Sequence, residues 1–159
     1  MLHAEPGGLG HPRASGSTTF ILYTGNSARS ILAESLLNHW GRGRFRGFSA
    51  GSFPKGQVHP FAVDRLNRMN LPAESLRSKS WDESAAPGAS PIDFIFTVCD
   101  NAAVEGSDVE KAAAFRKAFK ELETRIKLFT SLPIGSFDGM TLQSKLRNIG
   151  NSDGATKPT

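Results

Sequence analysis

Cysteine is almost missing from this 159-residue sequence, which contains only Cys99. One thiol cannot form a disulfide within a single chain, so we expect a reducing, cytoplasmic setting. Long apolar runs are missing too: the longest, such as residues 20–23 and 94–96, fall far short of the roughly 18 residues that cross a bilayer. No basic start followed by an apolar run marks a secretion signal. The sequence therefore predicts no membrane association.

An excess of negative charge is also missing, because the formal net charge is +4. Residues 1–82 carry ten Lys and Arg against five Asp and Glu, whereas residues 83–159 carry nine against ten. A basic half suits an anionic ligand such as phosphate, arsenate or nucleic acid. Asymmetries of this size are common, however, and an ordinary solvated surface is the simpler interpretation. No recognition-helix or aromatic-platform pattern points to nucleic acid, and no residues at metal-ligand spacing accompany the histidines.

The length predicts one domain. Residues 1–18 are rich in Gly and Pro and have little to bury, so we expect a flexible leader there, a domain over 19–150 and a flexible tail over 151–159. Between the ends, strand and helix patterns alternate, which indicates an α/β fold with a parallel sheet. Strands are predicted at 20–24, 45–50 and 93–99, and helices at 27–39, from Pro60, at 108–131 and at 138–149.

The turn after the first predicted strand is the most informative stretch. Residues 23–30 read Tyr-Thr-Gly-Asn-Ser-Ala-Arg-Ser and connect a strand to a helix, the usual place of the ligand crevice in an open α/β fold. Gly25 and Asn26 tolerate unusual backbone angles. Backbone amides at such a turn and a helix N-terminus favour an anion, and the planar fork of Arg29 matches a tetrahedral oxyanion. The residues therefore predict either an oxyanion cradle or an ordinary strand–helix turn.

Several ordered motifs resemble the low-molecular-weight tyrosine phosphatases, and most closely the thioredoxin-coupled arsenate reductases built on the same fold. These motifs are Phe20 to Ser30, Ala33-Glu34, Ser49-Ala-Gly51, Gly56 with Pro60, Arg77-Ser-Lys-Ser-Trp81, Thr97-Val-Cys-Asp-Asn-Ala102 and Ala114-Phe-Arg116. The resemblance implies a three-layer αβα fold with a short parallel sheet. It also implies an anion site at Thr24, Gly25, Asn26, Ser27, Ala28 and Arg29, a phosphate, arsenate or similar oxyanion as ligand, thioredoxin as partner, and no cofactor or metal.

The family pattern breaks at the catalytic residues. Tyr23 stands at the position of the nucleophilic cysteine, and a phenol with a pKa near 10 is only about one part in a thousand ionised at pH 7. Cys99 matches the middle cysteine of the series that acts in an arsenate reductase. The next cysteine of that series, which would close the resolving disulfide, is missing. The Asp-Pro pair that would supply the general acid, typically worth 10²–10⁴ in rate, is missing too. Tyr23, Arg29 and Cys99 are thus the candidate catalytic residues of an impaired or inactive enzyme.

The resemblance further implies that the family's segment between the motif ending at Ala102 and the following long helix is missing here, and that this segment carries the fourth, edge strand of the sheet. Without it the strand around Ile95 becomes an edge with unpaired backbone groups. We expect rearranged local chain, or self-association with another subunit, to cover that edge. The leading hypothesis is an arsenate reductase-like or phosphatase-like protein with an oxyanion-binding loop. The other hypotheses are a non-catalytic scaffold that binds an oxyanion or a partner, a nucleic-acid-binding domain, and a decayed copy with no selected role.

Overall fold

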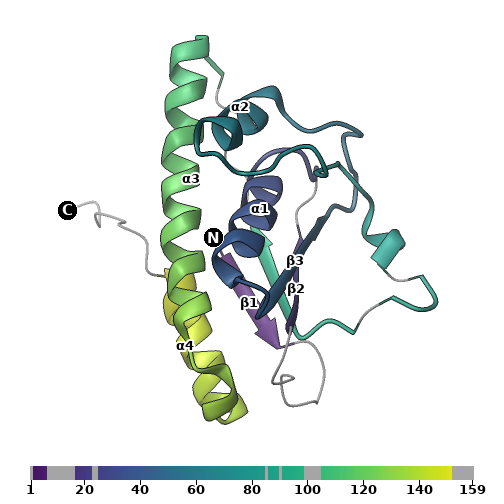
Figure 1. The fold of residues 1–159 in the computed structure, drawn as a ribbon, viewed down its shortest axis with the longest axis vertical. Helices are drawn as coiled ribbons and strands as arrows, with labels where there is room; N and C mark the ends of the chain where they lie inside the picture. The colour runs from purple at the N-terminus through teal and green to yellow at the C-terminus, as the bar shows by residue number, and fades with distance from the viewer. Residues whose placement is uncertain are drawn as a thin grey trace.

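The computed structural model describes residues 2–6, 17–22, 25–84, 86–89, 91–98 and 105–151. Figure 1 shows the order of the elements along the chain. They are β1 (Leu2–Pro6), β2 (Ser17–Leu22), α1 (Arg29–Gly41), β3 (Phe45–Ala50), α2 (Pro60–Arg68), the 3₁₀ turn η1 (Trp81–Ser84), β4 (Phe94–Val98), α3 (Asp108–Ser131), the 3₁₀ turn η2 (Ile134–Ser136) and α4 (Gly139–Asn151). None of the described helices combines the length and apolarity that crossing a membrane requires.

The four strands form one sheet in the order β1-β4-β2-β3. Strand β2 is central and runs parallel to both of its neighbours, with Ile21 opposite Ser49 of β3 and opposite Phe96 of β4. Helix α1 connects the parallel pair β2 and β3, as a crossover connection must. These elements confirm the predicted α/β class.

Strand β1 corrects the prediction of a flexible leader over residues 1–18. Residues 2–6 pair antiparallel with β4, from Leu2 opposite Val98 to Pro6 opposite Phe94, and β2 already begins at Ser17. We predict above that local chain or a second subunit covers the β4 edge, and the chain's own N-terminal segment lies along it. Residues 7–16, and residues 152–159 of the predicted tail, lie outside the described residues.

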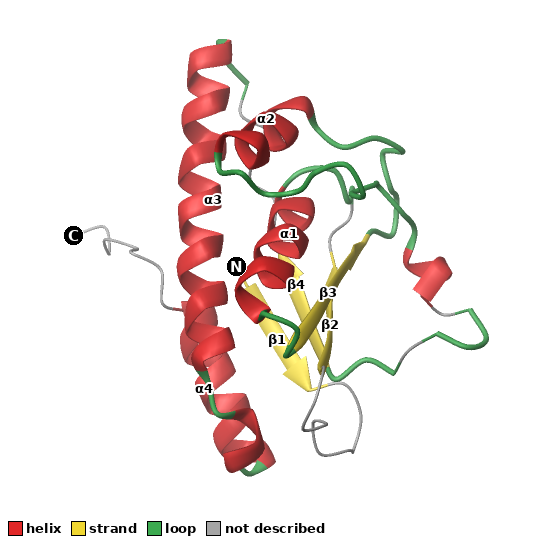
Figure 2. Ribbon diagram, in the orientation of Figure 1, coloured by secondary structure: helices red, strands yellow, loops and turns green. Residues whose placement is uncertain are grey.

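The core lies between the sheet and the helices on one of its faces. Phe129 of α3 packs its ring on Phe45 of β3 and on Phe94 and Phe96 of β4, with ring centroids 4.8–5.3 Å apart. Helix α1 packs against β3 and α3, and α4 packs against β1 and α3. Figure 2 shows α1, α3 and α4 on one side of the strands, whereas the short 3₁₀ turn η1 lies away from them, beyond the strands. Large apolar residues recur every three or four positions along α3 and form a buried stripe, namely Phe115, Phe119, Leu122, Ile126 and Phe129.

The expected three layers are not present in the described part of the chain, where the helices and the sheet form two. Side chains on β3 and β4 alternate between buried and partly or fully exposed, which is the pattern of a half-covered sheet. Phe48 and Ile95 are half-buried and Arg46 and Thr97 are exposed, whereas Phe45, Phe94 and Phe96 on the other face are buried beneath Phe129 of α3. The apolar run over 93–99 therefore belongs to a strand buried on one face rather than two.

Helix α1 is fastened to the outer edge of β3 by Asn38. The Asn38 side chain accepts from the Gly47 amide at 2.9 Å and donates to the Gly47 carbonyl and the Glu34 carbonyl, both at 3.0 Å. A Cβ at Gly47 would come within 3.2 Å of the Leu37 Cβ, so the close approach of helix and strand requires glycine here. Asn38 thus satisfies backbone groups at a sheet edge and holds the C-terminal half of α1 against β3.

Candidate oxyanion site

The loop between β2 and α1 lies where parallel strands end, which is the usual ligand edge of an α/β sheet. The described part of the loop, Gly25 to Ala28, is buried, and Arg29 begins α1 and is partly buried. Of the other predicted site residues, Tyr23, Thr24 and Cys99 lie outside the described residues. The structure therefore places Gly25, Asn26, Ser27, Ala28 and Arg29 together at the start of one helix.

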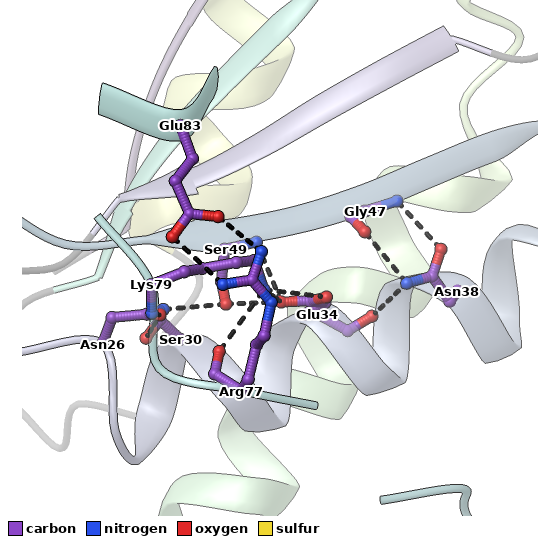
Figure 3. A network of polar contacts seen from close by, with 9 residues as sticks. All are labelled: Asn26, Ser30, Glu34, Asn38, Gly47, Ser49, Arg77, Lys79 and Glu83. Atoms are coloured by element: carbon purple, nitrogen blue, oxygen red, sulfur yellow. Dashed lines mark hydrogen bonds and ion pairs between the residues drawn. The ribbon is translucent and has the colours of Figure 1, made fainter. Parts of the chain in front are cut away.

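Asn26 fixes the conformation of this loop. Its backbone has a φ of 38°, in the left-handed region that asparagine tolerates better than most residues. Its side-chain amide donates to the Ser30 hydroxyl at 3.1 Å and to the Ser49 hydroxyl at 2.8 Å, and its carbonyl oxygen accepts from the Lys79 amide at 2.7 Å. The side chain is fully buried and joins α1, β3 and the segment after α2, as Figure 3 shows.

Glu34 forms a second buried set of contacts directly beside Asn26. Its Oε2 accepts from the Ser49 amide at 2.9 Å and from the Ser49 hydroxyl at 2.5 Å. The same oxygen pairs with Lys79 Nζ at 3.0 Å, and the two side chains are only 13% and 10% exposed. A buried carboxylate is tolerated when it is paired and hydrogen-bonded in this way. Ser49 therefore links Asn26 to Glu34, because its hydroxyl accepts from the Asn26 amide and donates to the Glu34 carboxylate.

The carbonyl groups of the loop are held by backbone amides from the connection between β3 and α2. The Lys55 amide donates to the Gly25 carbonyl at 3.0 Å, and the His59 amide donates to the Ser27 carbonyl at 2.7 Å. His59 also caps α2, because its Nδ1 accepts from the Phe61 amide at 3.3 Å. The loop is therefore fixed from both of its sides, by side chains on one and by backbone groups on the other.

The start of α1 has the electrostatic character of an anion site. Its first turn contains no acidic residue, and the N-cap residue Ala28 has no side chain that could satisfy the first amides of the helix. The positive end of the helix dipole and the charge of Arg29 thus coincide there.

A second arginine, Arg125 of α3, lies within electrostatic reach of Arg29. Burial lowers the pKa of the Arg125 guanidinium below its ordinary value, the Glu121 carboxylate opposes this change, and the charge of Arg29 lowers the pKa further. Arg125 is only 7% exposed. Arg125 could not be singled out from the sequence, because it lies between Leu122 and Ile126 in the buried stripe of α3 and a buried arginine leaves no signal in an apolar pattern.

An ion pair outside the buried network orders the segment that carries Lys79. The Glu83 carboxylate accepts from both terminal nitrogens of Arg77, and Lys79 Nζ also donates to the Arg77 carbonyl at 3.4 Å. The hydrogen bonds from Arg77 lower the pKa of Glu83, and the same pair raises the pKa of Arg77. Both side chains are substantially exposed, so this pair adds little stability by itself. Within the described residues, no cluster of three His, Cys, Asp or Glu could hold a metal ion.

An α/β fold with a buried, arginine-bearing strand–helix loop defines a class of candidate oxyanion-binding proteins, and comparisons with known proteins identify the family. Residues 18–127 match the family described as low molecular weight phosphotyrosine protein phosphatase. An arsenate reductase of Halalkalibacterium halodurans is 30% identical over 137 residues, which are 69% of this chain and 92% of that protein.

Solved structures share the fold of this chain. The low molecular weight protein tyrosine phosphatase from T. tengcongensis is similar with a TM-score of 0.55 and 23% identity, over 73% of this chain and 99% of that one. An arsenate reductase in its phosphate-binding state is similar with a TM-score of 0.56 and 17% identity, over 72% and 97%. This chain belongs to the low molecular weight phosphotyrosine protein phosphatase family, and arsenate reductases are among its relatives.

Proposed function

We propose that this protein is an arsenate reductase-like or phosphatase-like protein that binds a phosphate, arsenate or similar oxyanion at residues 24–29 and is impaired or inactive as an enzyme. The observation that carries the proposal is Asn26, which is fully buried, left-handed and fixed by three hydrogen bonds. A turn held this firmly at a helix N-terminus is suited to present several backbone amides to one anion.

The surroundings of the loop support an anion as the ligand. The carbonyl groups of Gly25 and Ser27 are engaged by amides of the neighbouring connection, so they are not directed at a ligand. Arg29 supplies a guanidinium at the first position of α1, and a guanidinium can bind two oxygens of a tetrahedral ion at once. One related arsenate reductase has been solved in a phosphate-binding state.

The proposed impairment follows from the residue types at the catalytic positions. In this family a cysteine thiolate at the start of the loop attacks the phosphorus or arsenic atom, and the helix N-terminus lowers the thiol pKa from about 8.5 toward neutrality. Tyr23 stands at this position. A phenol is a much weaker acid at neutral pH, and its ring occupies far more space than a thiol. No Asp-Pro pair occurs in the sequence to supply the general acid.

The reductase relay is affected as well. Cys99 matches the middle cysteine of that relay and is the sole cysteine of the sequence, so a disulfide within the chain cannot form. Thioredoxin remains the partner that the family resemblance implies. Without a disulfide to reduce, however, thioredoxin would have no substrate on a single copy of this chain. A scaffold that binds an oxyanion or a partner without turnover is the second candidate function, and the buried network favours it because it preserves loop geometry independently of the nucleophile.

Calorimetric titration of the full-length protein with phosphate and with arsenate tests the binding proposal. We expect both ions to bind, and Arg29→Ala to weaken binding by about tenfold or more, since charge-assisted hydrogen bonds contribute roughly 1.5–3 kcal/mol. Arg42→Gly is the matched control: it removes one positive charge at the opposite end of α1, where the positive φ of 47° suits glycine. Equal weakening by both variants, or no binding to the unmodified protein, would contradict the proposal.

Activity assays test the impairment separately. Aryl phosphate hydrolysis and thioredoxin-linked arsenate reduction should not exceed a heat-denatured control, and clear turnover would refute the proposed loss. We expect Tyr23→Cys to restore slow ester cleavage, because it returns the thiol to a loop whose conformation is maintained by Asn26. Failure of Tyr23→Cys to cleave the ester, although it still binds phosphate, would show that the general acid or the loop shape is the larger defect.

A further inference from the structure

A cleft of about 210 Å³ lies between α2 and α3, apart from the loop at residues 25–29. Figure 1 shows α2 lying beside the N-terminal part of α3, and the two helices are in contact. The cleft is lined mainly by two aromatic residues, three arginines and one carboxylate, namely Phe61, Phe115, Arg65, Arg68, Arg116 and Asp64. An apolar cavity of about 150 Å³ accommodates benzene, so this cleft has room for one ring and a small charged group.

The charges in the cleft are unequal. Arg68 pairs with Asp64 at 2.8 Å, so the single carboxylate of the lining is already neutralised. Within the part of the chain that the structure describes, Arg116 and Arg65 form no ion pair with a carboxylate. Two positive charges therefore remain uncompensated in one small cleft, an arrangement that attracts an anion.

Arg65 is positioned rather than freely solvated. Its guanidinium lies over the ring of Phe119, with 4.8 Å between Cζ and the ring centroid. Its Nε is buried and makes no hydrogen bond to the described residues. Because the Nε is shielded from solvent, an anion in the cleft would have to meet the terminal nitrogens of this guanidinium, which can hold two oxygens at once.

The aromatic wall of the cleft is equally well defined. Phe61 and Phe115 are stacked with ring centroids 5.8 Å apart and an interplanar angle of 28°, and His59 packs on Phe115 at 4.9 Å. Phe115 is buried and Phe61 is half-buried, so their positions are fixed by the core. Aromatic rings beside guanidinium groups suit a ligand that has both a flat apolar part and a negative charge.

We propose that the cleft between α2 and α3 is a second binding site, for a small organic anion that combines one aromatic ring with a carboxylate or phosphonate-type head group. Arg116 and Arg65 hold the head group, and the ring lies against Phe61 and Phe115. This site does not depend on the oxyanion loop, because none of its lining residues belongs to residues 25–29.

Amide chemical shifts of the full-length protein, followed during titration with phenylphosphonate, benzoate and inorganic phosphate, test this proposal. We expect the two aromatic anions to shift amides at 61–68 and 112–119, and inorganic phosphate to bind there at least tenfold more weakly. Phenylphosphonate carries no ester bond, so residual phosphatase activity cannot consume it. Equal affinity of all three probes for these residues would refute the contribution of the aromatic wall.

Variants separate this cleft from the loop and from general electrostatics. Arg116→Gln, at an exposed position, should weaken phenylphosphonate binding by about tenfold, the usual effect of losing one charge-assisted hydrogen bond. Arg65→Gln should have a similar effect. Lys117→Gln is the matched control, since Lys117 is the next residue on α3, is 80% exposed and does not line the cleft. It should change the affinity less than twofold, and Arg29→Ala should leave these shifts unchanged.

Two further results would overturn the proposal. The first is equal weakening by Arg116→Gln and Lys117→Gln, which would indicate attraction by the overall charge. The second is a set of shifts confined to residues 25–30 and abolished by Arg29→Ala, which would assign the aromatic anions to the oxyanion loop. A loss of loop binding with the cleft shifts retained would contradict only the proposed function.

Discussion

Asn26→Ala should destabilise the protein by about 4 kcal/mol. The substitution removes three hydrogen bonds, two to the buried hydroxyls of Ser30 and Ser49 and one to the Lys79 amide. Each hydrogen bond contributes roughly 1 kcal/mol net to stability, and each buried polar group that loses its partner raises the cost further. Alanine at the observed φ of 38° adds about 1–2 kcal/mol, since a side chain with a Cβ is unfavourable in the left-handed region.

Asn26→Gly separates the two contributions. Glycine loses the same three hydrogen bonds but adopts a φ of 38° without steric strain, so we expect it to be about 1 kcal/mol less destabilising than alanine. Urea unfolding of the full-length variants measures both differences in the free energy of unfolding. The comparison uses one common slope for the dependence of that free energy on urea concentration. Phosphate titration of the same variants shows whether the loop still binds its ion. A loss below 1 kcal/mol for Asn26→Ala, or equal losses for the two variants, would refute the view that Asn26 maintains the loop.

Three other predictions concern the sheet and a helix start. Gly47→Ala should cost about 1–3 kcal/mol by chemical unfolding, because the new Cβ would meet Leu37 at 3.0–3.2 Å, whereas Gly139→Ala has open space and should be nearly neutral. Deletion of residues 1–6 should speed amide exchange along β4 and promote self-association in sedimentation, and unchanged exchange would show that β1 does not protect that edge. Hydrogen bonds from Thr141 lower the pKa of Asp138 in the folded protein below its ordinary 3.8. The Asp138 carboxylate therefore stabilises the folded state fully above about pH 3.8, and this stabilisation is lost as the pH falls through the lowered pKa of the folded protein. Thermal unfolding between pH 5 and pH 2 should therefore show a smaller acid loss for Asp138→Asn than for the unmodified protein.

The long helices could be predicted from the sequence because their apolar residues repeat at helical spacing. Helix α3 has the predicted bounds, and Ser107 begins it with a capping box to Glu110. Helix α4, predicted at 138–149, spans Gly139–Asn151 and buries Leu142, Leu146 and Ile149, which recur at helical spacing. Helix α2 starts at Pro60 as predicted and ends at Arg68, so Met69 lies beyond its last residue and is 40% exposed.

The N-terminal strand could not be predicted because its stability comes from its partner. Residues 2–6 form an edge strand against β4, and the many glycines and prolines that follow indicated a flexible leader. Pro6 is compatible with that position, since an edge strand leaves one side of its backbone without ladder hydrogen bonds. The start of β2 could not be predicted either, because Ser17 to Thr19 are polar. These residues are held in the strand by pairing with β3 and, at Thr19, also with β4.

The candidate site was predictable only as residue types along one turn. Asn26 and Arg29 could be singled out because their chemistry suits a tight bend and an oxyanion. The roles of Glu34, Ser49 and Lys79 could not, because these residues come from three separate segments and meet only in the folded chain. A carboxylate and an ammonium group far apart in sequence give no signal of pairing until the packing of α1 against β3 is known.

Strand β1 also has a consequence for the order in which the protein can fold. Its partner residues lie at 94–98, so the pairing of Leu2 with Val98 closes a loop that contains most of the chain. Contacts of such long range form late, because the entropy lost on closing the loop must be overcome before they are made. During synthesis, the first strand of the sheet therefore leaves the ribosome long before β4 exists, and β2, α1 and β3 can assemble in the interval while it remains unpaired.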